Sequence, residues 1–427
     1  MIEINEKRSC CGCTACESIC PEACISMVAD NEGFLYPKIE SEKCTSCHLC
    51  ERVCPVSNKL ITVNGSFIKD TLTKKELAKV VVEQTTNLPF SYVTFLCDDS
   101  LRLDSTSGGF FTAIANEIIE RGGKVYGVEV NDSKEIIHGV TDTVEGLGRF
   151  RGSKYVQSAQ SGIFKLIKKD LHEDIWVLYT GTPCQVEGLK RYLGKEYTKL
   201  VTADIFCHGV GSPKYWRKYV EFMEQKYGAP INMVKFREKT YGYNSACMAL
   251  YFENGKSSHK GHDDDLYWTA FSKFFIFRPS CYDCVFKTIN HAADYSIGDF
   301  WDTSGLDEQF RNANGCSLIL VHSEKGNTLL KKMTSCIELD EINLEKALII
   351  NGGSMHSKLI TSSPKAKCRG MFMEEMDGMQ LDDLVEKYIP LSLTQKIKCR
   401  IKPFLYKAKL LYFVKQLSRL ILGDPYP

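Results

Sequence analysis

The sequence predicts a mixed fold of the α/β or α+β class, in which a small cysteine-dense N-terminal domain precedes a larger domain and a helical basic tail. Three observations support this prediction. Cysteines crowd the first 60 residues, strand-like and helix-like runs alternate from about residue 91, and segment 391–423 holds eight basic residues and no acidic one. Such alternation is typical of domains in which helices cover a sheet.

The chain has 427 residues, which is too long for one ordinary hydrophobic core and favours two or three structural units. Its net charge of +1 gives no general attraction for nucleic acid, so we expect no nucleic-acid partner. No apolar run reaches about 18 residues and the first ten residues lack a hydrophobic stretch, so neither a membrane-spanning helix nor a signal peptide is expected. The 20 cysteines occur in close clusters, which indicates a reduced, cytoplasmic, metal-binding protein.

Changes in composition divide the chain into four segments. Residues 1–60 are predicted to form a metal-organised domain, because ligation supplies folding energy that so small a core cannot. Residues 61–90 are expected to be a polar linker. Residues 91–340 are expected to form the larger α/β domain, and residues 341–427 a helical C-terminal extension.

Within the larger domain, short apolar runs predict strands, and apolar residues at helical spacing predict helices. The expected strands are Tyr92–Leu96, Lys124–Val130, Ile175–Tyr179, Leu200–Phe206, Met233–Phe236, Met248–Phe252 and Ser317–Val321. The expected helices are Phe110–Glu120, Phe164–Leu171 and Pro213–Tyr227. The segment Gly181–Cys184 is expected to be a loop.

The basic tail is expected to be helical. Pro403 is a suitable first residue, and Phe404, Leu411 and Val414 would then share one face. Two interpretations remain open. The helix either packs on its own domain or contacts an anionic surface, such as a membrane or a partner protein.

Two complete cysteine runs of the form Cys-x2-Cys-x2-Cys-x3-Cys-Pro are the clearest metal-binding motifs in the sequence. This is the bacterial ferredoxin pattern, in which the fourth cysteine of each run ligates the cluster of the other run. Zinc motifs instead pair two Cys-x2-Cys units across a long gap. Cys11 and Cys24 fall outside the pattern and are expected to be buried thiols. The predicted ligands are Cys10, Cys13, Cys16 and Cys54 for one 4Fe–4S cluster, and Cys44, Cys47, Cys50 and Cys20 for the second.

Four further cysteines stand beside unusual loops. Cys184 and Cys207 follow apolar strands, and strand ends are where open α/β sheets build their sites. Cys281 and Cys284 form a Cys-x2-Cys unit. Together the four thiolates would suffice for a third 4Fe–4S cluster, while a structural zinc ion or plain buried thiols are the alternatives.

Six segments occur in a recognisable order, at residues 105–112, 151–158, 181–189, 207–209, 279–287 and 293–301. With them the chain resembles the coenzyme F-420 hydrogenase/dehydrogenase beta-subunit family, in the form with an N-terminal ferredoxin domain of two 4Fe–4S clusters. The resemblance covers about residues 1–320. It implies an FAD site in the α/β domain and, as in cluster-rich relatives, a further iron–sulfur cluster near that flavin.

On this resemblance, several loop residues are interpreted as flavin contacts. Small residues before a helix can admit a phosphate to the helix N-terminus, although an ordinary glycine turn has the same sequence. The basic stretch near residue 154 either contacts the flavin or is a solvated loop. The predicted cofactor-binding residues are Ser107, Gly108, Gly109, Arg151, Lys154, Tyr155, Gln157, Thr182, Gln185 and Asp299.

Three aromatic or imidazole side chains near these motifs receive weaker interpretations. His208 either relays protons or is an ordinary loop histidine. Trp301 is expected to belong to the core, and His291 is expected to be structural.

The sequence therefore predicts an iron–sulfur flavoprotein oxidoreductase, either a coenzyme F-420-type dehydrogenase or a ferredoxin-dependent reductase. A flavin is the natural junction between clusters that carry single electrons and an acceptor that takes two. The expected partners are a redox protein (a ferredoxin, or a dehydrogenase or hydrogenase subunit) and a small-molecule acceptor. The alternative is a flavin-free electron-transfer subunit that docks on a partner enzyme. No catalytic residue is identified.

Overall fold

A computed structural model describes residues 4, 6–57, 79, 82–83, 89–262, 264–301, 303, 306–311, 314–349, 368–407 and 410. The predicted linker 61–90 lies almost entirely outside the described residues, and so does most of the tail after residue 407. Within the described part of the chain, no helix is both long enough and apolar enough to cross a membrane.

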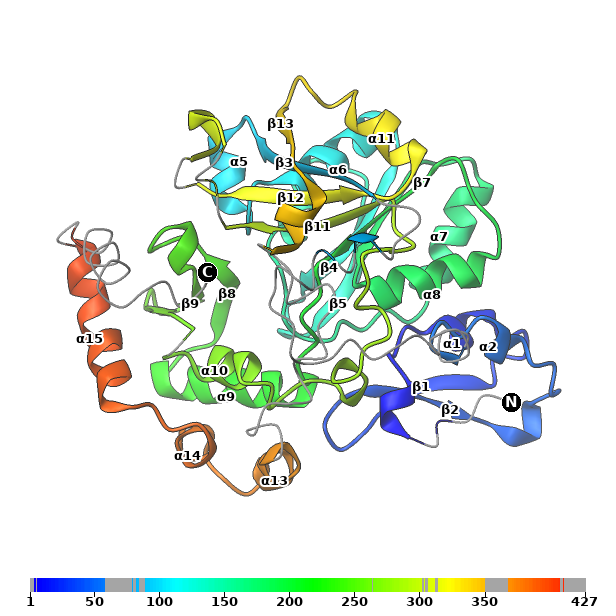
Figure 1. Ribbon diagram of the computed structural model, residues 1–427. Helices are drawn as coiled ribbons and strands as arrows, with labels where there is room; N and C mark the ends of the chain where they lie inside the picture. Colours follow the sequence, from blue (N-terminus) through cyan, green and yellow to red (C-terminus); the bar gives the residue numbers. More distant parts are fainter. Residues whose placement is uncertain are drawn as a thin grey trace.

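The N-terminal domain consists of a hairpin and two short helices (Figure 1). Each helix starts directly after a residue in the left-handed region, Thr14 with φ 63° and His48 with φ 59°. The strands pair antiparallel, with Ile25 opposite Ile39. The elements are α1 (Ala15–Ile19), β1 (Ile25–Ala29), β2 (Leu35–Ile39) and α2 (Leu49–Arg52).

The larger domain is built on an eight-stranded mixed sheet with the strand order β13-β3-β12-β11-β7-β6-β4-β5. Strands β11, β7, β6 and β4 run parallel to one another, and the remaining neighbours pair antiparallel. The strand expected at Ile175 begins at Val177, whereas the predicted bounds of β4 agree with the structure. The strands are β3 (Phe90–Leu96), β4 (Lys124–Val130), β5 (Ile136–Thr141), β6 (Val177–Gly181), β7 (Leu200–Ile205), β11 (Tyr295–Phe300), β12 (Cys316–Val321) and β13 (Ile337–Glu341).

Helices cover both faces of this sheet. Side chains alternate along a strand, so Val125 and Leu178 face α6, while the adjacent Tyr126 and Val177 face α7 and α8. The buried cluster on the α7–α8 face also includes thiols of the N-terminal domain, among them Cys13. The hydrophobic core is therefore continuous from the large sheet into the ferredoxin run. The helices are α5 (Asp99–Asp104), α6 (Phe110–Glu120), α7 (Ile163–His172), α8 (Pro183–Leu193) and α11 (Glu324–Leu330).

A second unit of the larger domain contains a three-stranded antiparallel sheet with the order β10-β9-β8. One face of β9 packs on helices through Met248, Leu250 and Phe252. Helices from the C-terminal segment share that core through Phe372 and Leu384. The elements are β8 (Ile231–Glu238), β9 (Cys247–Phe252), β10 (Ser257–Lys260), α9 (Pro213–Tyr227), α10 (Leu266–Ser272), α13 (Arg369–Glu375) and α14 (Leu381–Tyr388).

The tail helix α15 spans Leu393–Lys407 and lies beside the three-stranded sheet (Figure 1). It begins ten residues before Pro403, so the predicted start of this helix is wrong. Leu393, Ile397 and Phe404 are 79%, 56% and 73% exposed. The described part of the tail therefore presents apolar side chains outward.

Candidate functional site

The eight cysteines of the two ferredoxin runs lie in two groups, each of which combines residues of both runs. Burial raises the pKa of the Cys16 thiol, and the nearby thiols of Cys10 and Cys54 raise it further. Cys13 belongs to the same neighbourhood. The second group lines a small cavity of about 20 Å³, formed by Cys20, Cys44, Cys47 and Cys50 together with Cys24.

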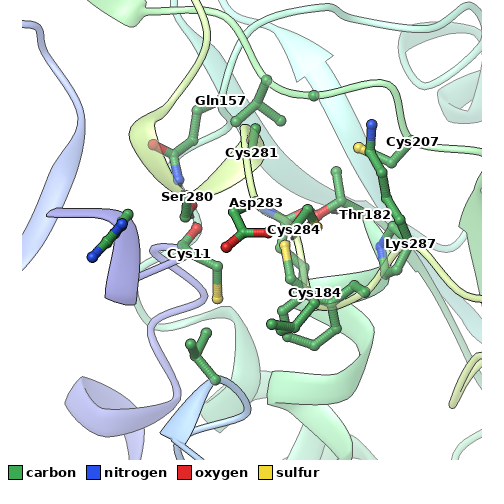
Figure 2. Close-up of a pocket in the computed structure, with 18 of the residues that line it drawn as sticks. Cys11, Gln157, Thr182, Cys184, Cys207, Ser280, Cys281, Asp283, Cys284 and Lys287 are labelled. Atoms are coloured by element: carbon green, nitrogen blue, oxygen red, sulfur yellow. Dashed lines mark hydrogen bonds between the residues drawn. The ribbon is translucent and has the colours of Figure 1, made fainter. Parts of the chain in front are cut away.

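A larger cavity of about 370 Å³ lies between the N-terminal and larger domains and is lined by the four additional cysteines (Figure 2). Cys184 lies in the first turn of α8, so the loop expected at Gly181–Cys184 ends two residues early. The helix starts at Pro183 because Thr182 and Gln185 form a reciprocal capping box around it. Cys207 follows β7, and Cys281 and Cys284 come from the segment after α10.

The spacing of these four thiols distinguishes between two kinds of metal site. Burial raises the pKa of the Cys207 thiol well above its usual value. The nearby thiols of Cys281, Cys184 and Cys284 raise the same pKa by smaller amounts. Among the described residues, one group of three potential ligand atoms lies within 4.8 Å of one another, and it contains none of these four cysteines. A zinc ion with bonds of about 2.3 Å would bring its ligand sulfurs to about 3.8 Å. The wider spacing suits the larger body of a cubane cluster.

A fifth cysteine, Cys11, also points into this cavity (Figure 2). Its buried thiol is hydrogen-bonded to the thiols of Cys13 and Cys184. The expectation of a buried thiol agrees with this position, but the spacing of the cysteines assigned Cys11 no further role. Cys11 connects the first ferredoxin run to the four additional cysteines.

Arg278 joins the two domains at this point. The Arg278 side chain is fully buried, its Nε donates to the carbonyl oxygen of Cys10 at 2.8 Å, and its Nη1 donates to Oε1 of Gln157 at 2.7 Å. The side-chain amide of Gln157 donates to the carbonyl oxygen of Cys11 at 3.2 Å. The side-chain amide of Gln160 donates to the carbonyl oxygen of Cys13 at 2.8 Å. The cysteine run is thus held by side chains far away in the sequence, and neither Arg278 nor Gln160 was predicted as a site residue.

The structure divides the ten predicted cofactor-binding residues into two groups. Gln157, Thr182 and Gln185 line the cysteine cavity. The Thr182 hydroxyl lies 3.2 Å from the sulfur of Cys184, and Gln185 donates to the hydroxyl of Ser158. These three residues therefore have sulfur ligands as their neighbours.

The other seven residues do not line this cavity, and three of them contact two basic residues at the end of β8. Arg237 donates to Oδ2 of Asp299 at 2.5 Å, and Lys239 donates to the carbonyl oxygen of Ser107 at 2.8 Å. Arg237 is also close to the buried Tyr155 hydroxyl, whose pKa is raised chiefly by burial. The Nε of Arg237 is buried and has no hydrogen-bond partner among the described residues. This nitrogen lacks an acceptor such as a bound anion would supply.

The glycine turn before α6 packs against the sheet. The amide of Gly108 donates to the hydroxyl of Ser317 at 2.9 Å. A Cβ on Gly108 would lie 2.4 Å from the carbonyl oxygen of Thr94. Glycine is thus required here for the close approach to β3 and β12, and the Gly108 amide is already bonded within the protein. Gly109, with φ 90°, starts α6.

Two lysines of this region are part-buried. Burial lowers the pKa of Lys154 to about 7, against the opposing effects of Glu129 and Asp104. Burial also lowers the pKa of Lys239 to about 7. Arg151 adds a guanidinium that lies 3.6 Å from Asp104. The region therefore gathers more basic than acidic side chains in a buried setting, which favours an anionic ligand.

Trp301 differs from its expected position, whereas His291 and His208 lie beside the cysteine cavity. Trp301 is 43% exposed and stacks on Tyr243, so the expectation that it belongs to the core is wrong. His291 lines the cysteine cavity, and its Nδ1 lies 2.9 Å from a carboxylate oxygen of Asp204. His208 is part-buried next to Cys207, and desolvation lowers its pKa to about 4.

Comparison with known proteins agrees with this arrangement. Residues 175–346 match the family described as the C terminus of the coenzyme F-420 hydrogenase/dehydrogenase beta subunit, and residues 9–58 match the 4Fe–4S dicluster domain. A solved chain from the xenon-derivatised F-420-reducing NiFe hydrogenase complex of Methanosarcina barkeri is 18% identical, covers 64% of this chain and 91% of its own length, and has a TM-score of 0.43. No curated protein matches significantly. The two matched segments together contain all twelve predicted cluster ligands, and they support the resemblance of the chain to the coenzyme F-420 hydrogenase/dehydrogenase beta-subunit family in the form with an N-terminal 4Fe–4S ferredoxin domain.

Proposed function

We propose that the protein is an iron–sulfur flavoprotein oxidoreductase that passes electrons between its 4Fe–4S clusters and a two-electron acceptor through FAD. The observation that carries this proposal is the cavity at which four additional cysteines meet the first ferredoxin run. When bound, the clusters would carry single electrons and FAD would exchange them with an acceptor that takes two.

Cys184, Cys207, Cys281 and Cys284 are the proposed ligands of a third 4Fe–4S cluster. All four thiols lie in one cavity, and in the described residues no three of them lie within 4.8 Å of one another, which favours a cluster over a single zinc ion. The hydroxyl of Thr182 is placed to donate to the Cys184 sulfur. Such hydrogen bonds to ligand sulfurs tune a cluster's reduction potential.

The basic region at the end of β8 is the proposed binding site for the phosphates of FAD. Arg237 has a buried Nε without a partner among the described residues, and Lys154 and Lys239 are part-buried amines that bond to backbone carbonyl oxygens. The amide of Gly108 is occupied by Ser317, so side chains rather than the glycine turn are expected to hold the phosphates. Tyr155 and Gln157 lie on one short segment that links this region to the cysteine cavity.

The second ferredoxin cluster is the proposed point of contact with a redox partner. Cys47 is exposed, whereas Cys13 and Cys16 are buried. Electron transfer requires a short path, so an external ferredoxin or a hydrogenase or dehydrogenase subunit is expected to dock near Cys47. The acceptor at the flavin end is proposed to be a small molecule, with coenzyme F-420 as the first candidate.

The proposal is tested by the metal and flavin content of protein purified and reconstituted without oxygen. Wild-type protein is expected to hold about twelve iron atoms and to release FAD on denaturation. The Cys281→Ser variant should hold about eight iron atoms. Cys336→Ser is the matched control, because this thiol bonds to the carbonyl oxygen of Met333 away from the site.

Two outcomes would contradict parts of the proposal. Eight iron atoms with one zinc ion in wild-type protein would identify the four cysteines as a zinc site. A full iron content without FAD, even after reconstitution, would instead favour a flavin-free electron-transfer subunit that docks on a partner enzyme.

A further inference from the structure

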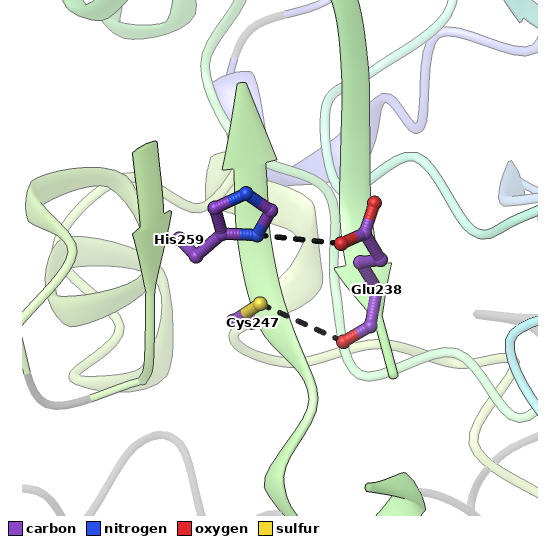
Figure 3. A group of neighbouring side chains, drawn as sticks. All are labelled: Glu238, Cys247 and His259. Carbon is purple, nitrogen blue, oxygen red and sulfur yellow. Dashed lines mark hydrogen bonds and ion pairs between the residues drawn. The ribbon is translucent and has the colours of Figure 1, made fainter. Parts of the chain in front are cut away.

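The three-stranded sheet carries a separate group of metal-ligand side chains, away from the cysteine cavity. Glu238 of β8, Cys247 of β9 and His259 of β10 each offer one ligand atom (Figure 3). These three atoms all lie within 4.8 Å of one another. The sequence pattern did not reveal the group, because its members are spread over 22 positions and follow no spacing rule for metal ligands.

Strand register brings the three side chains to one face of the sheet. Glu238 pairs directly with Cys247, and His259 pairs with Ala249, which lies two residues after Cys247 on the same face. A register shift between Lys235 and Glu238 sets this alignment. Bulges of this kind commonly re-aim a side chain at a functional position.

A neighbouring hydroxyl group orients the carboxylate ligand. Tyr251 donates to Oε2 of Glu238 at 2.7 Å, which leaves Oε1 facing Nδ1 of His259 at 3.3 Å. Outer-sphere hydrogen bonds like that of Tyr251 hold ligands in place in established metal sites. The hydroxyl of Thr240 bonds to Oε1 of Glu238 and lies 3.2 Å from the same Nδ1, so its contacts with these two atoms would give way to a bound ion.

The group is partly accessible and already attracts a cation. Cys247 is fully buried, whereas the side chains of Glu238 and His259 are 18% and 22% exposed, so an ion can enter from the carboxylate and imidazole side. The ammonium of Lys402, on α15, acts electrostatically on Cys247 and would lie 2.8 Å from a Cβ at Gly261. The Lys402 ammonium thus occupies the space that Gly261 leaves open, and its charge lowers the pKa of the Cys247 thiol against the larger effect of burial.

We propose that Glu238, Cys247 and His259 bind a zinc ion, independently of the iron–sulfur cysteines. A thiolate, an imidazole and a carboxylate form a donor set that suits zinc, while the thiolate disfavours magnesium and calcium. Three protein ligands leave a fourth position for water or another ligand. The thiol loses its proton when the ion binds, and Lys402 moves away.

A zinc ion at this site would also stabilise the neighbouring basic region. Glu238 lies between Arg237 and Lys239 in the sequence, and alternate residues of a strand point to opposite faces. An ion bound at Glu238 would therefore fix the strand end from which Arg237 and Lys239 extend. This consequence follows from the strand and holds whether or not FAD binds there.

The test compares zinc content in full-length protein whose iron–sulfur clusters have been loaded first and whose iron content is verified. Wild type and Cys336→Ser are expected to retain about one zinc ion per chain after dialysis against micromolar zinc. His259→Ala, a partly exposed position, and Cys247→Ser should each bind zinc at least tenfold more weakly with unchanged iron content.

X-ray absorption at the zinc edge identifies the ligands. One sulfur at about 2.3 Å and the remaining nitrogen or oxygen ligands at about 2.0–2.1 Å are expected. Equal zinc retention in wild type and His259→Ala would overturn the proposal. A first shell of four sulfurs would also overturn it, since the zinc would then occupy cluster cysteines.

Discussion

Arg278 donates from Nε to the carbonyl oxygen of Cys10 at 2.8 Å, and its Nη2 lies 3.6 Å from the Cys10 sulfur. Arg278 precedes the Cys281–Cys284 pair by only a few residues. A single buried guanidinium therefore lies between the first ferredoxin run and the segment that carries two ligands of the proposed third cluster.

Replacing Arg278 with Met is expected to lower the reduction potential of the first ferredoxin cluster. A nearby positive charge stabilises the more negative, reduced state, and its loss at a few ångströms is worth on the order of 100 mV at an effective dielectric constant near 20. Potentiometric titration followed by electron paramagnetic resonance measures the shift. Arg121→Met is the control, because Arg121 pairs with Glu117 on α6. Equal potentials in both variants would refute a role for the guanidinium charge.

Gly12→Ala is expected to weaken the docking of the ferredoxin run. Gly12 has φ 71°, and an added Cβ would lie 2.5 Å from Nε2 of Gln157. Gly122→Ala is a matched control, since Gly122 has φ 70° and nothing within 4 Å of an added Cβ. Both variants should lose about 1 kcal/mol from the left-handed backbone, and Gly12→Ala about 1–3 kcal/mol more from overpacking. Denaturant unfolding followed by cluster absorbance measures the free energy of unfolding of each variant. Equal decreases in the two variants would contradict the docking contact.

Binding of FAD is expected to weaken as the pH rises through about 7. Burial lowers the pKa of Lys154 to about 7, and phosphate favours the charged amine, so the pKa of Lys154 rises in the complex. Above pH 7, binding must then take up a proton, and the affinity falls by up to tenfold per pH unit. Flavin fluorescence titrations from pH 6 to 9 measure the slope. Lys154→Met should bind FAD more weakly with a shallower slope, and an unchanged slope would exclude Lys154 from the site.

Lys402→Met is expected to tighten zinc binding at Glu238, Cys247 and His259. The ammonium of Lys402 acts on Cys247, so it competes with the ion for the same negative charges. Removing it should improve the affinity several-fold, on the order of 1 kcal/mol, as for partly exposed charge pairs. Competition with a chromogenic chelator measures the dissociation constant for zinc. Lys396→Met, which removes a surface pair with Glu386, should leave it unchanged.

Helix α15 contacts the domain through Tyr406, and its exposed apolar side chains are available for contact with an external surface as well. Leu393, Ile397 and Phe404 are more than half exposed on a helix rich in lysine and arginine. Full-length protein is therefore expected to float with anionic vesicles at low salt, while protein truncated at residue 390 should not. Equal behaviour of the two proteins would end the membrane interpretation.

Local signals in the sequence predicted those parts of the fold that depend on near neighbours. The eight cysteines of the ferredoxin runs follow a fixed spacing, and α9 has Ser212 and Pro213 at its start and Gly228 at its end. The start of α8 has an equally clear local signal, because Thr182 and Gln185 form a capping box around Pro183. The prediction of a loop at Cys184 overlooks this signal.

The remaining features depend on contacts between distant segments. Gln160 and Arg278 are 147 and 268 positions from their cysteine partners, and no spacing rule connects them. The group around Glu238 depends on a register shift in β8 that the sequence does not mark. The division of the chain at residues 60, 90 and 340 stays a prediction, although α13 and α14 share a core with α9.

The docking of the ferredoxin run on Arg278 and Gln160 has a consequence for how the protein matures. The carbonyl oxygens that these side chains bind belong to Cys10 and Cys13, whose positions depend on the metal that they ligate. Cluster insertion into the N-terminal runs is therefore expected to stabilise the contact between the two domains, because it restricts the backbone whose oxygens Arg278 and Gln160 bind.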